Sequence, residues 1–193
     1  MVFTIKNQQK GFSPVRAAGG RIANPSDQFE VKGAYNTDIF SGQVVTQASD
    51  GFVRVLNAAN DLVLGVFNGV FYIDTQGDTI FKPFWPKDTA VQTGSLVKAS
   101  VFDSVGTYFQ IDSDADTVFA DTDKFADLTP NTGTGGDTTT GRSTAQLDHS
   151  NLDASIDATN NVVRIRERSQ QPGDVRLVIV SFIRPQFGGQ IGS

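Results

Sequence analysis

The sequence offers few residues for acid–base or nucleophilic chemistry, because His149 is its only histidine and it contains no cysteine. His149 stands in Leu147-Asp148-His149-Ser150, where an aspartate, a histidine and a serine follow one another. A catalytic triad is defined by geometry in the fold and not by adjacency along the chain. The glycine-rich stretch Gly133-Thr134-Gly135-Gly136 lacks the lysine of a phosphate-binding loop. We therefore expect a protein that is not an enzyme.

Alternating aspartates form the one pattern that is typical of a metal site. Asp112, Asp114 and Asp116 are followed by Asp121 and Asp123. Alternate carboxylates can converge on Ca²⁺ when the chain turns sharply. An EF-hand loop would next require a glycine and later a glutamate, and both are missing here. If the chain stays extended, the three aspartates instead share one solvated face. Asp112, Asp114 and Asp116 are thus a candidate calcium site, and we expect no other metal and no cofactor.

Two further features could contact a partner. Trp85 is the only tryptophan and stands in Phe84-Trp85-Pro86. It is a candidate aromatic anchor for an interface or, together with Tyr72, for a sugar ring, with ordinary core packing as the alternative. Arginines alternate along the segment 162–168, at Arg164, Arg166 and Arg168. On a strand they would form one face able to pair with acidic groups of a partner or a neighbouring subunit, or else a solvated edge.

Charge is unevenly distributed along the 193 residues, whose net charge is −5. Residues 1–35 carry five Lys and Arg against two acidic residues, whereas residues 101–160 carry eleven Asp against two basic residues. The overall acidity argues against nucleic acid as the principal partner, because phosphate binding needs clustered Lys and Arg. A basic N-terminal part and an acidic body would suit the docking of one molecule on another; solvated surface is the alternative.

Short segments rich in Val, Ile, Phe and Tyr, separated by Gly, Asp and Asn, predict an all-β protein. Asp50-Gly51 and Asn60-Asp61 resemble hairpin turns, and Gly65 and Gly69 indicate bulges or corners within a strand. The nearly continuous apolar run 175–183 predicts a central strand or one covered on both faces. The segments expected as strands are 39–46, 51–56, 62–73, 79–85, 96–102, 108–111, 118–120, 162–168 and 175–183.

Composition divides the chain into four parts. Residues 1–36 contain few large apolar side chains and read as an extended N-terminal arm. Residues 37–128 form the β body, and residues 129–161 form a long Gly/Thr-rich loop followed by an irregular segment or a short helix. Residues 162–193 form a C-terminal strand pair and tail. Arm residues that we expect to contact a partner are Lys6, Lys10, Phe12, Arg16 and Arg21.

No segment resembles a targeting signal or a membrane span. The longest apolar run, residues 62–73, is broken by glycines and is too short to cross a bilayer. The first residues carry Lys6 and Lys10 where a signal peptide would need an apolar stretch. We expect no membrane partner, and the absence of cysteine suits assembly in a reducing cytoplasm.

Several stretches together resemble the decoration, or cement, proteins of tailed-bacteriophage heads. The resemblance covers most of the chain, although no single motif is specific. The stretches that carry it are Gly11-Phe12-Ser13-Pro14-Val15-Arg16, Ser41-Gly42-Gln43-Val44-Val45, Asp50-Gly51-Phe52-Val53-Arg54-Val55, Leu64-Gly65-Val66-Phe67-Asn68-Gly69-Val70-Phe71-Tyr72, Pro83-Phe84-Trp85-Pro86 and Gly141-Arg142-Ser143-Thr144-Ala145-Gln146-Leu147-Asp148.

The resemblance implies a small twisted β-barrel or β-tulip-like body without catalytic residues. It further implies a homo-oligomer, most often a trimer, that binds the outer surface of the head and cross-bridges major capsid proteins. The protein would then be a structural component of the virion, assembled in the host cytoplasm. A carbohydrate-binding module, or a tail or connector component of the virion, is the alternative function.

Overall fold

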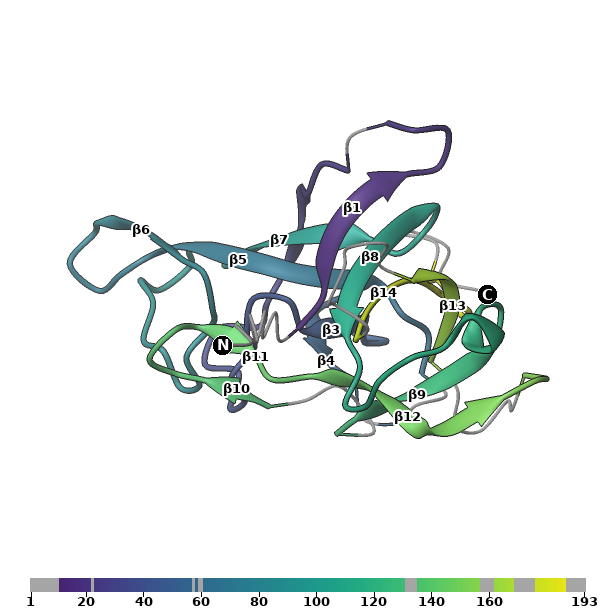
Figure 1. The fold of residues 1–193 in the computed structure, drawn as a ribbon. Coiled ribbons are helices and arrows are strands. Elements are labelled where there is room, and N and C mark those ends of the chain that lie inside the picture. The colour runs from purple at the N-terminus through teal and green to yellow at the C-terminus, as the bar shows by residue number, and fades with distance from the viewer. Residues whose placement is uncertain are drawn as a thin grey trace, which may run out of the picture.

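The computed structural model describes residues 11–21, 23–56, 58, 61–130, 135–156, 162–168 and 176–186, and they form an all-β fold, as predicted (Figure 1). Beside the strands there is one short 3-10 helix, η1 (Phe119–Asp121). The strands are β1 (Ser13–Ala17), β2 (Ser26–Glu30), β3 (Val44–Gln47), β4 (Val53–Val55), β5 (Gly65–Ile73), β6 (Thr79–Lys82), β7 (Lys98–Asp103), β8 (Thr107–Asp112), β9 (Phe125–Thr129), β10 (Gly136–Asp137), β11 (Arg142–Ser143), β12 (Gln146–Asp153), β13 (Val163–Arg168) and β14 (Leu177–Phe182).

Six strands form what we call the curled sheet, in the order β1-β8-β14-β13-β9-β12, with every neighbouring pair antiparallel. The sheet bends until the chain just after β8 meets its far edge, where Ser113 bridges Leu147 of β12. This single bridge is the link found between β8 and β12 in the described residues, so the body is a curled open sheet rather than a closed barrel. Strand β14 lies in its middle, as expected for the apolar run 175–183.

A second sheet, the central sheet, has the order β2-β7-β5-β3-β4, and β6 pairs with the far end of β5. The β5–β6 hairpin projects to one side of the molecule, while β9, β12 and β13 lie at the opposite end (Figure 1). Strand β5 contains a bulge between Phe67 and Gly69. Gly65 is required by close approach, since a Cβ there would lie 2.0 Å from the carbonyl oxygen of Phe102. The predicted Asp50-Gly51 turn does join β3 to β4, whereas Asn60 lies outside the described residues.

Successive residues of β3 and β5 serve two different hydrophobic cores. Val44 and Val66 pack with the inner face of the curled sheet. Val45 and Phe67 point the other way, into a second core with Trp85. Strand β3 and the first half of β5 are therefore buried on both faces, which explains the almost continuous apolar sequence at the start of the run 62–73. The far end of β5 has an exposed face that includes Phe71.

The expected N-terminal arm is part of the body from residue 11 onward. Strand β1 pairs with β8, and β2 pairs with β7. Phe12 is only 3 % exposed and packs against Phe109 and Phe182 in the first core. The arm prediction is wrong for these residues because edge strands draw their stability from backbone pairing and need few large side chains of their own. Residues 1–10 lie outside the described residues.

Two other segments differ from their predicted structure. Residues 146–153, expected as irregular chain or a short helix, form the eight-residue strand β12. The sequence did not reveal this strand because six of its eight side chains are polar and only Leu147 is buried. Residues 118–120, expected as a strand, instead enter η1. In the described part of the chain no helix is long and apolar enough to cross a membrane.

The burial of Phe12 gives a direct test of the fold. We expect Phe12→Ala to lower the free energy of unfolding by about 3 kcal/mol, because truncating a buried Phe leaves a cavity in the core. Phe81→Ala is the control, since Phe81 is 52 % exposed and should cost about 1 kcal/mol or less. Urea denaturation followed by fluorescence measures both variants, and equal, small effects would mean that residue 12 lies outside the core.

Candidate functional site: a buried aspartate beneath an exposed turn

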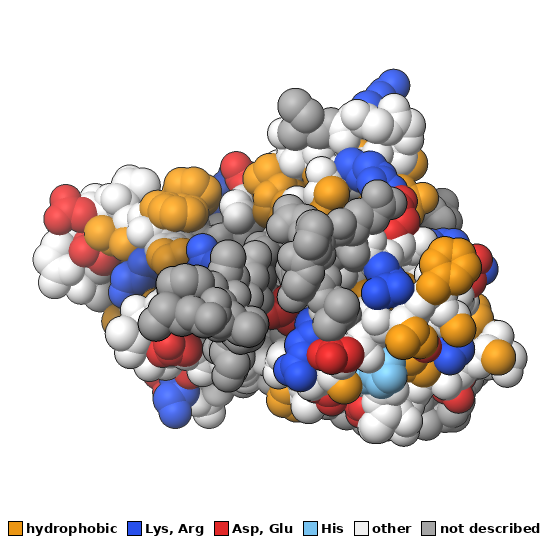
Figure 2. Space-filling model, viewed as in Figure 1, with side chains coloured by type: hydrophobic (Ala, Val, Ile, Leu, Met, Phe, Trp, Pro, Cys, Tyr) orange, Lys and Arg blue, Asp and Glu red, His pale blue; other side chains and the backbone are white. Residues whose placement is uncertain are grey.

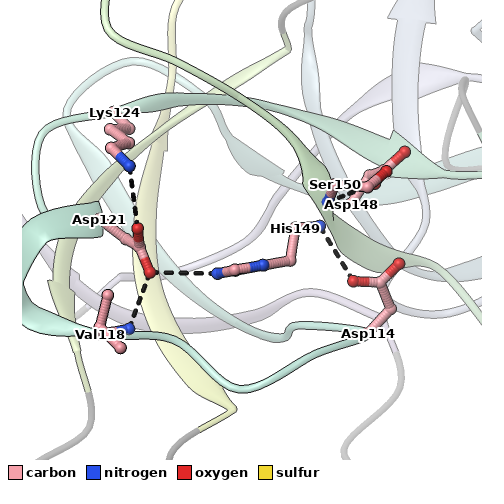
Figure 3. Close-up of polar contacts among 7 residues, drawn as sticks. All are labelled: Asp114, Val118, Asp121, Lys124, Asp148, His149 and Ser150. Carbon is pink, nitrogen blue, oxygen red and sulfur yellow. Dashed lines mark hydrogen bonds and ion pairs between the residues drawn. The ribbon is translucent and has the colours of Figure 1, made fainter.

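The most connected polar cluster centres on Asp121, whose side chain is only 4 % exposed (Figure 3). The backbone N–H of Val118 donates to Asp121 Oδ2 at 2.7 Å. Lys124 Nζ lies 3.1 Å from Asp121 Oδ1, and His149 Nε2 lies 3.1 Å from Asp121 Oδ2. One carboxylate thus ties its own turn to strand β12.

Backbone hydrogen bonds anchor both ends of the loop that carries Asp121. Before the turn, Asp114 N–H donates to the carbonyl of Leu147, and Asp114 Oδ1 accepts the His149 N–H at 2.9 Å. After the turn, Asp123 N–H donates to the carbonyl of Ile165. The loop 113–124 is therefore fastened to β12 on one side and to β13 on the other.

The pKa of Asp121 is lowered from its ordinary value. Burial by itself would raise this pKa, because it penalises the charged carboxylate. The hydrogen bonds from Val118 N–H, Lys124 and His149, together with the charge of Lys124, outweigh burial. The carboxylate is therefore held ionised by partners that it already contacts in the folded protein.

The cluster does not form a catalytic triad. Ser150 Oγ donates to Asp148 Oδ1 at 2.6 Å, whereas the His149 ring faces Asp121 (Figure 3). A nucleophile must lie within hydrogen-bond reach of its base, and here the serine and the histidine have separate partners. The arrangement is suited to holding a loop in place.

The candidate calcium ligands do not converge. Asp112 is buried at the end of β8. Asp114 accepts the backbone N–H of His149, and Asp116 pairs with Arg176 at 2.9 Å. In the residues that the structure describes, no group of three or more His, Cys, Asp or Glu side chains is placed to hold a metal ion. The geometry therefore gives no support to the calcium candidate, because the chain after β8 runs along β12 and the three carboxylates have separate partners or positions.

Trp85 is not an exposed anchor. Its side chain is fully buried in the second core, where its ring packs edge-on against Tyr72. The indole Nε1–H donates to the carbonyl of Tyr35 at 3.2 Å. Tyr72 is 5 % exposed, so neither aromatic ring is available to stack on a sugar. Core packing, the alternative considered for Trp85, is what the structure contains.

The predicted arginine face is interrupted by a bulge in β13 between Ile165 and Glu167. Arg164 lies over the Phe125 ring and pairs with Asp123 at 3.1 Å. Arg166 Nε donates to Ser181 Oγ at 2.8 Å on the same outer face.

Arg168 lies on the other side of β13. Beyond the bulge it stands opposite buried Val178, and residues paired across strands share a face. The prediction of one three-arginine face is therefore wrong for Arg168. A bulge adds one residue and shifts the alternation, and residue types alone do not reveal it.

The arm residues expected to contact a partner have separate positions. Phe12 is in the core, as described above. Arg16 pairs with Glu167 across the outer face of the curled sheet and lies over the Tyr108 ring. Arg21 is exposed beside β1. Lys6 and Lys10 lie outside the described residues.

Sequence reasoning missed the two hydrophobic side chains that the Asp121 turn displays. Val118 is 56 % exposed and Phe119 is 82 % exposed, the highest value among the large hydrophobic residues described. A Val-Phe-Ala segment reads as a strand, and only the acidic residues on both sides of it could have indicated a turn.

Comparison with known proteins finds no relative for this chain. No family model matches, no curated protein matches, and no solved structure matches.

Asp121 predicts a pH-dependent contribution to stability. We expect Asp121→Asn to lower the free energy of unfolding by about 2 kcal/mol at pH 7, because it removes charged hydrogen bonds to a buried group. The folded-state pKa lies below 3.8, so this difference is fully present above pH 3.8 and disappears as the pH falls through the folded-state value. Denaturation of both proteins across the acid range measures it. Asp27→Asn, on an exposed position of β2, should show little difference at any pH; a difference that grows in acid would contradict the arrangement.

Proposed function

We propose that this chain is a structural component of a tailed-phage virion, a decoration protein that binds the outer surface of the head and cross-bridges major capsid proteins. The observation that carries the proposal is how the surface is used. The polar groups around Asp121 bind one another and hold the loop 113–124 in place. Large hydrophobic side chains such as Phe119 are instead exposed to water. Single exposed hydrophobic residues are ordinary, but adjacent ones, such as Val118 with Phe119 or Phe71 with Phe81, are typical of protein-binding surfaces.

These side chains occur at both ends of the molecule. Phe71 and Phe81, 39 % and 52 % exposed, lie on the projecting β5–β6 hairpin. Val118 and Phe119 lie beside β12 and β13 at the opposite end. Figure 2 shows hydrophobic side chains at the surface at both of these ends. A protein that bridges two neighbours needs two separate contact surfaces, and this arrangement supplies them.

The resemblance of several sequence stretches to head decoration proteins motivates the same proposal, and the all-β fold is compatible with it. Binding many equivalent sites would stabilise the shell by mass action, since each bound copy favours the assembled state. A homo-oligomer, with a trimer favoured, would strengthen binding through effective concentration. In this proposal the partner is the major capsid protein and the location is the head surface, reached after assembly in the host cytoplasm.

The proposed alternatives have less support. Carbohydrate binding was expected to use Trp85, Tyr72 and calcium, and in the structure both aromatic rings are buried and the three aspartates are separated. A tail or connector component shares the features that support head binding, and the binding experiment distinguishes the two locations.

Cosedimentation tests the proposal. Purified protein is mixed with expanded, undecorated heads assembled from the major capsid protein encoded in the same genome. We expect binding that saturates at a fixed ratio to the capsid protein and raises the temperature at which the heads disassemble. A folded protein that fails to bind heads would overturn the proposal, and binding to isolated tails or connectors instead would relocate the protein within the virion.

The N-terminal residues give a second prediction. We expect deletion of residues 1–10, which carry Lys6 and Lys10, to leave the melting temperature unchanged and to weaken head binding, because a basic extension can add contacts to an acidic shell. Deletion of residues 1–36 should instead unfold the protein, since it removes β1, β2 and the buried Phe12. Unchanged head occupancy by the first variant would refute the role of these residues.

A further inference from the structure

We propose that Val118 and Phe119, which we call the hydrophobic knuckle, are the principal anchor of this protein in its partner, and that the partner offers an apolar recess rimmed by Lys or Arg. This inference rests on the proposed function and specifies the contact that it uses. It names a single turn of the chain and the chemistry of the surface that receives it.

The exposure of the knuckle costs stability, because two large hydrophobic side chains stay in water instead of being buried. Burying a Val or a Phe side chain contributes about 1.5–3 kcal/mol, so leaving both in water forgoes that stabilisation. Val118 and Phe119 are 56 % and 82 % exposed, whereas the neighbouring Thr117 and Asp121 are buried. The polar residues on both sides thus point inward and the apolar residues point outward, which is the reverse of the usual arrangement.

The knuckle is also held rigidly. Asp121 N–H donates to the carbonyl of Val118, and Thr122 N–H donates to the carbonyl of Phe119, closing the 3-10 turn. The Asp121 carboxylate accepts the Val118 N–H and contacts Lys124 and His149, which fixes the turn against β12. A preorganised anchor binds more tightly because little conformational entropy remains to be lost on docking.

The other exposed aromatic residues differ in this respect. Phe71 and Phe81 pack on each other across β5 and β6, with ring centroids 4.7 Å apart. Such a cross-strand pair stabilises a hairpin and accounts for part of their presence. Phe119 makes no ring contact with any other residue that the structure describes. With 82 % of Phe119 exposed, little of its side chain is packed within the described part of the fold.

The charge around the knuckle defines the partner's rim. Residues 112–123 contain five Asp and no Lys or Arg. Asp114, Asp116 and Asp123 are exposed on either side of the knuckle, and Arg176 and Arg164 pair with only the last two. A basic rim would complement the remaining negative charge and speed association, while the apolar recess would supply affinity.

The decisive experiment compares Phe119→Ala with Leu62→Ala in the head cosedimentation assay. Leu62 is 53 % exposed and belongs neither to the knuckle nor to the Phe71–Phe81 pair. It therefore controls for the loss of one exposed hydrophobic side chain. We expect Phe119→Ala to weaken binding about 30-fold, as for a hot-spot residue, and Leu62→Ala to leave it unchanged. Both variants should keep the melting temperature of the wild type, because neither removes a buried contact.

The outcomes separate the two proposals. If the wild type binds heads and Phe119→Ala binds equally well, the knuckle is not the anchor and the decoration function stands. If the folded wild type does not bind heads, the decoration function fails and the knuckle inference fails with it.

A charge variant tests the basic rim. Asp116→Lys replaces the Asp116–Arg176 pair with two positive charges beside the knuckle. We expect it to slow association with heads, and the difference from wild type to shrink as salt concentration rises. Asp27→Lys, at an exposed position of β2, is the matched charge reversal and should have a smaller effect. Equal effects of the two reversals would overturn the assignment of a basic rim at the knuckle.

Discussion

The structure depends on burying the middle of the central sheet, at β3 and the first half of β5, on both faces. In β3 and β5, neighbouring residues divide between the two cores: Val44 and Val66 enter one, and Val45 and Phe67 enter the other. A one-residue slip of either strand would exchange these faces, so the register is strongly specified. Because β5 lies between β7 on one side and β3 and β6 on the other, the same constraint fixes where the projecting hairpin leaves the body.

The curled sheet follows from the same packing. Its inner face must cover the first core, and the sheet bends until Ser113 reaches Leu147 of β12. That meeting leaves residues 113–124 to cross between β12 and β13 at one end of the sheet. Asp121 fastens this crossing, and its buried carboxylate needs several donors because an unpaired buried charge would be strongly destabilising. The polar cluster thus fastens the loop that the bend of the sheet creates.

The proposed function depends on the side chains that the loop 113–124 exposes at the surface. The cluster turns polar groups inward and leaves Val118 and Phe119 in water. Together with the β5–β6 hairpin at the opposite end, it gives a rigid body two apolar surfaces separated by the body itself. The proposed cross-bridging of capsid proteins requires that property, and it explains how a chain without an evident reaction centre in its described residues could act by binding alone.

The sequence by itself determined the all-β class, the Asp50-Gly51 hairpin and the central place of β14, because local turn chemistry and apolar runs encode them. Only the tertiary structure decided the rest. Pairing with distant strands made strands of residues 13–17, which contain only one large apolar side chain, and of residues 146–153, which are mostly polar. A bulge in β13 places Arg168 on the opposite face from Arg164, and Trp85 is buried in the second core. The hydrogen bonds of buried Asp121 hold the turn in which Phe119 is exposed. Each of these depends on contacts between residues distant in sequence, which local patterns do not specify.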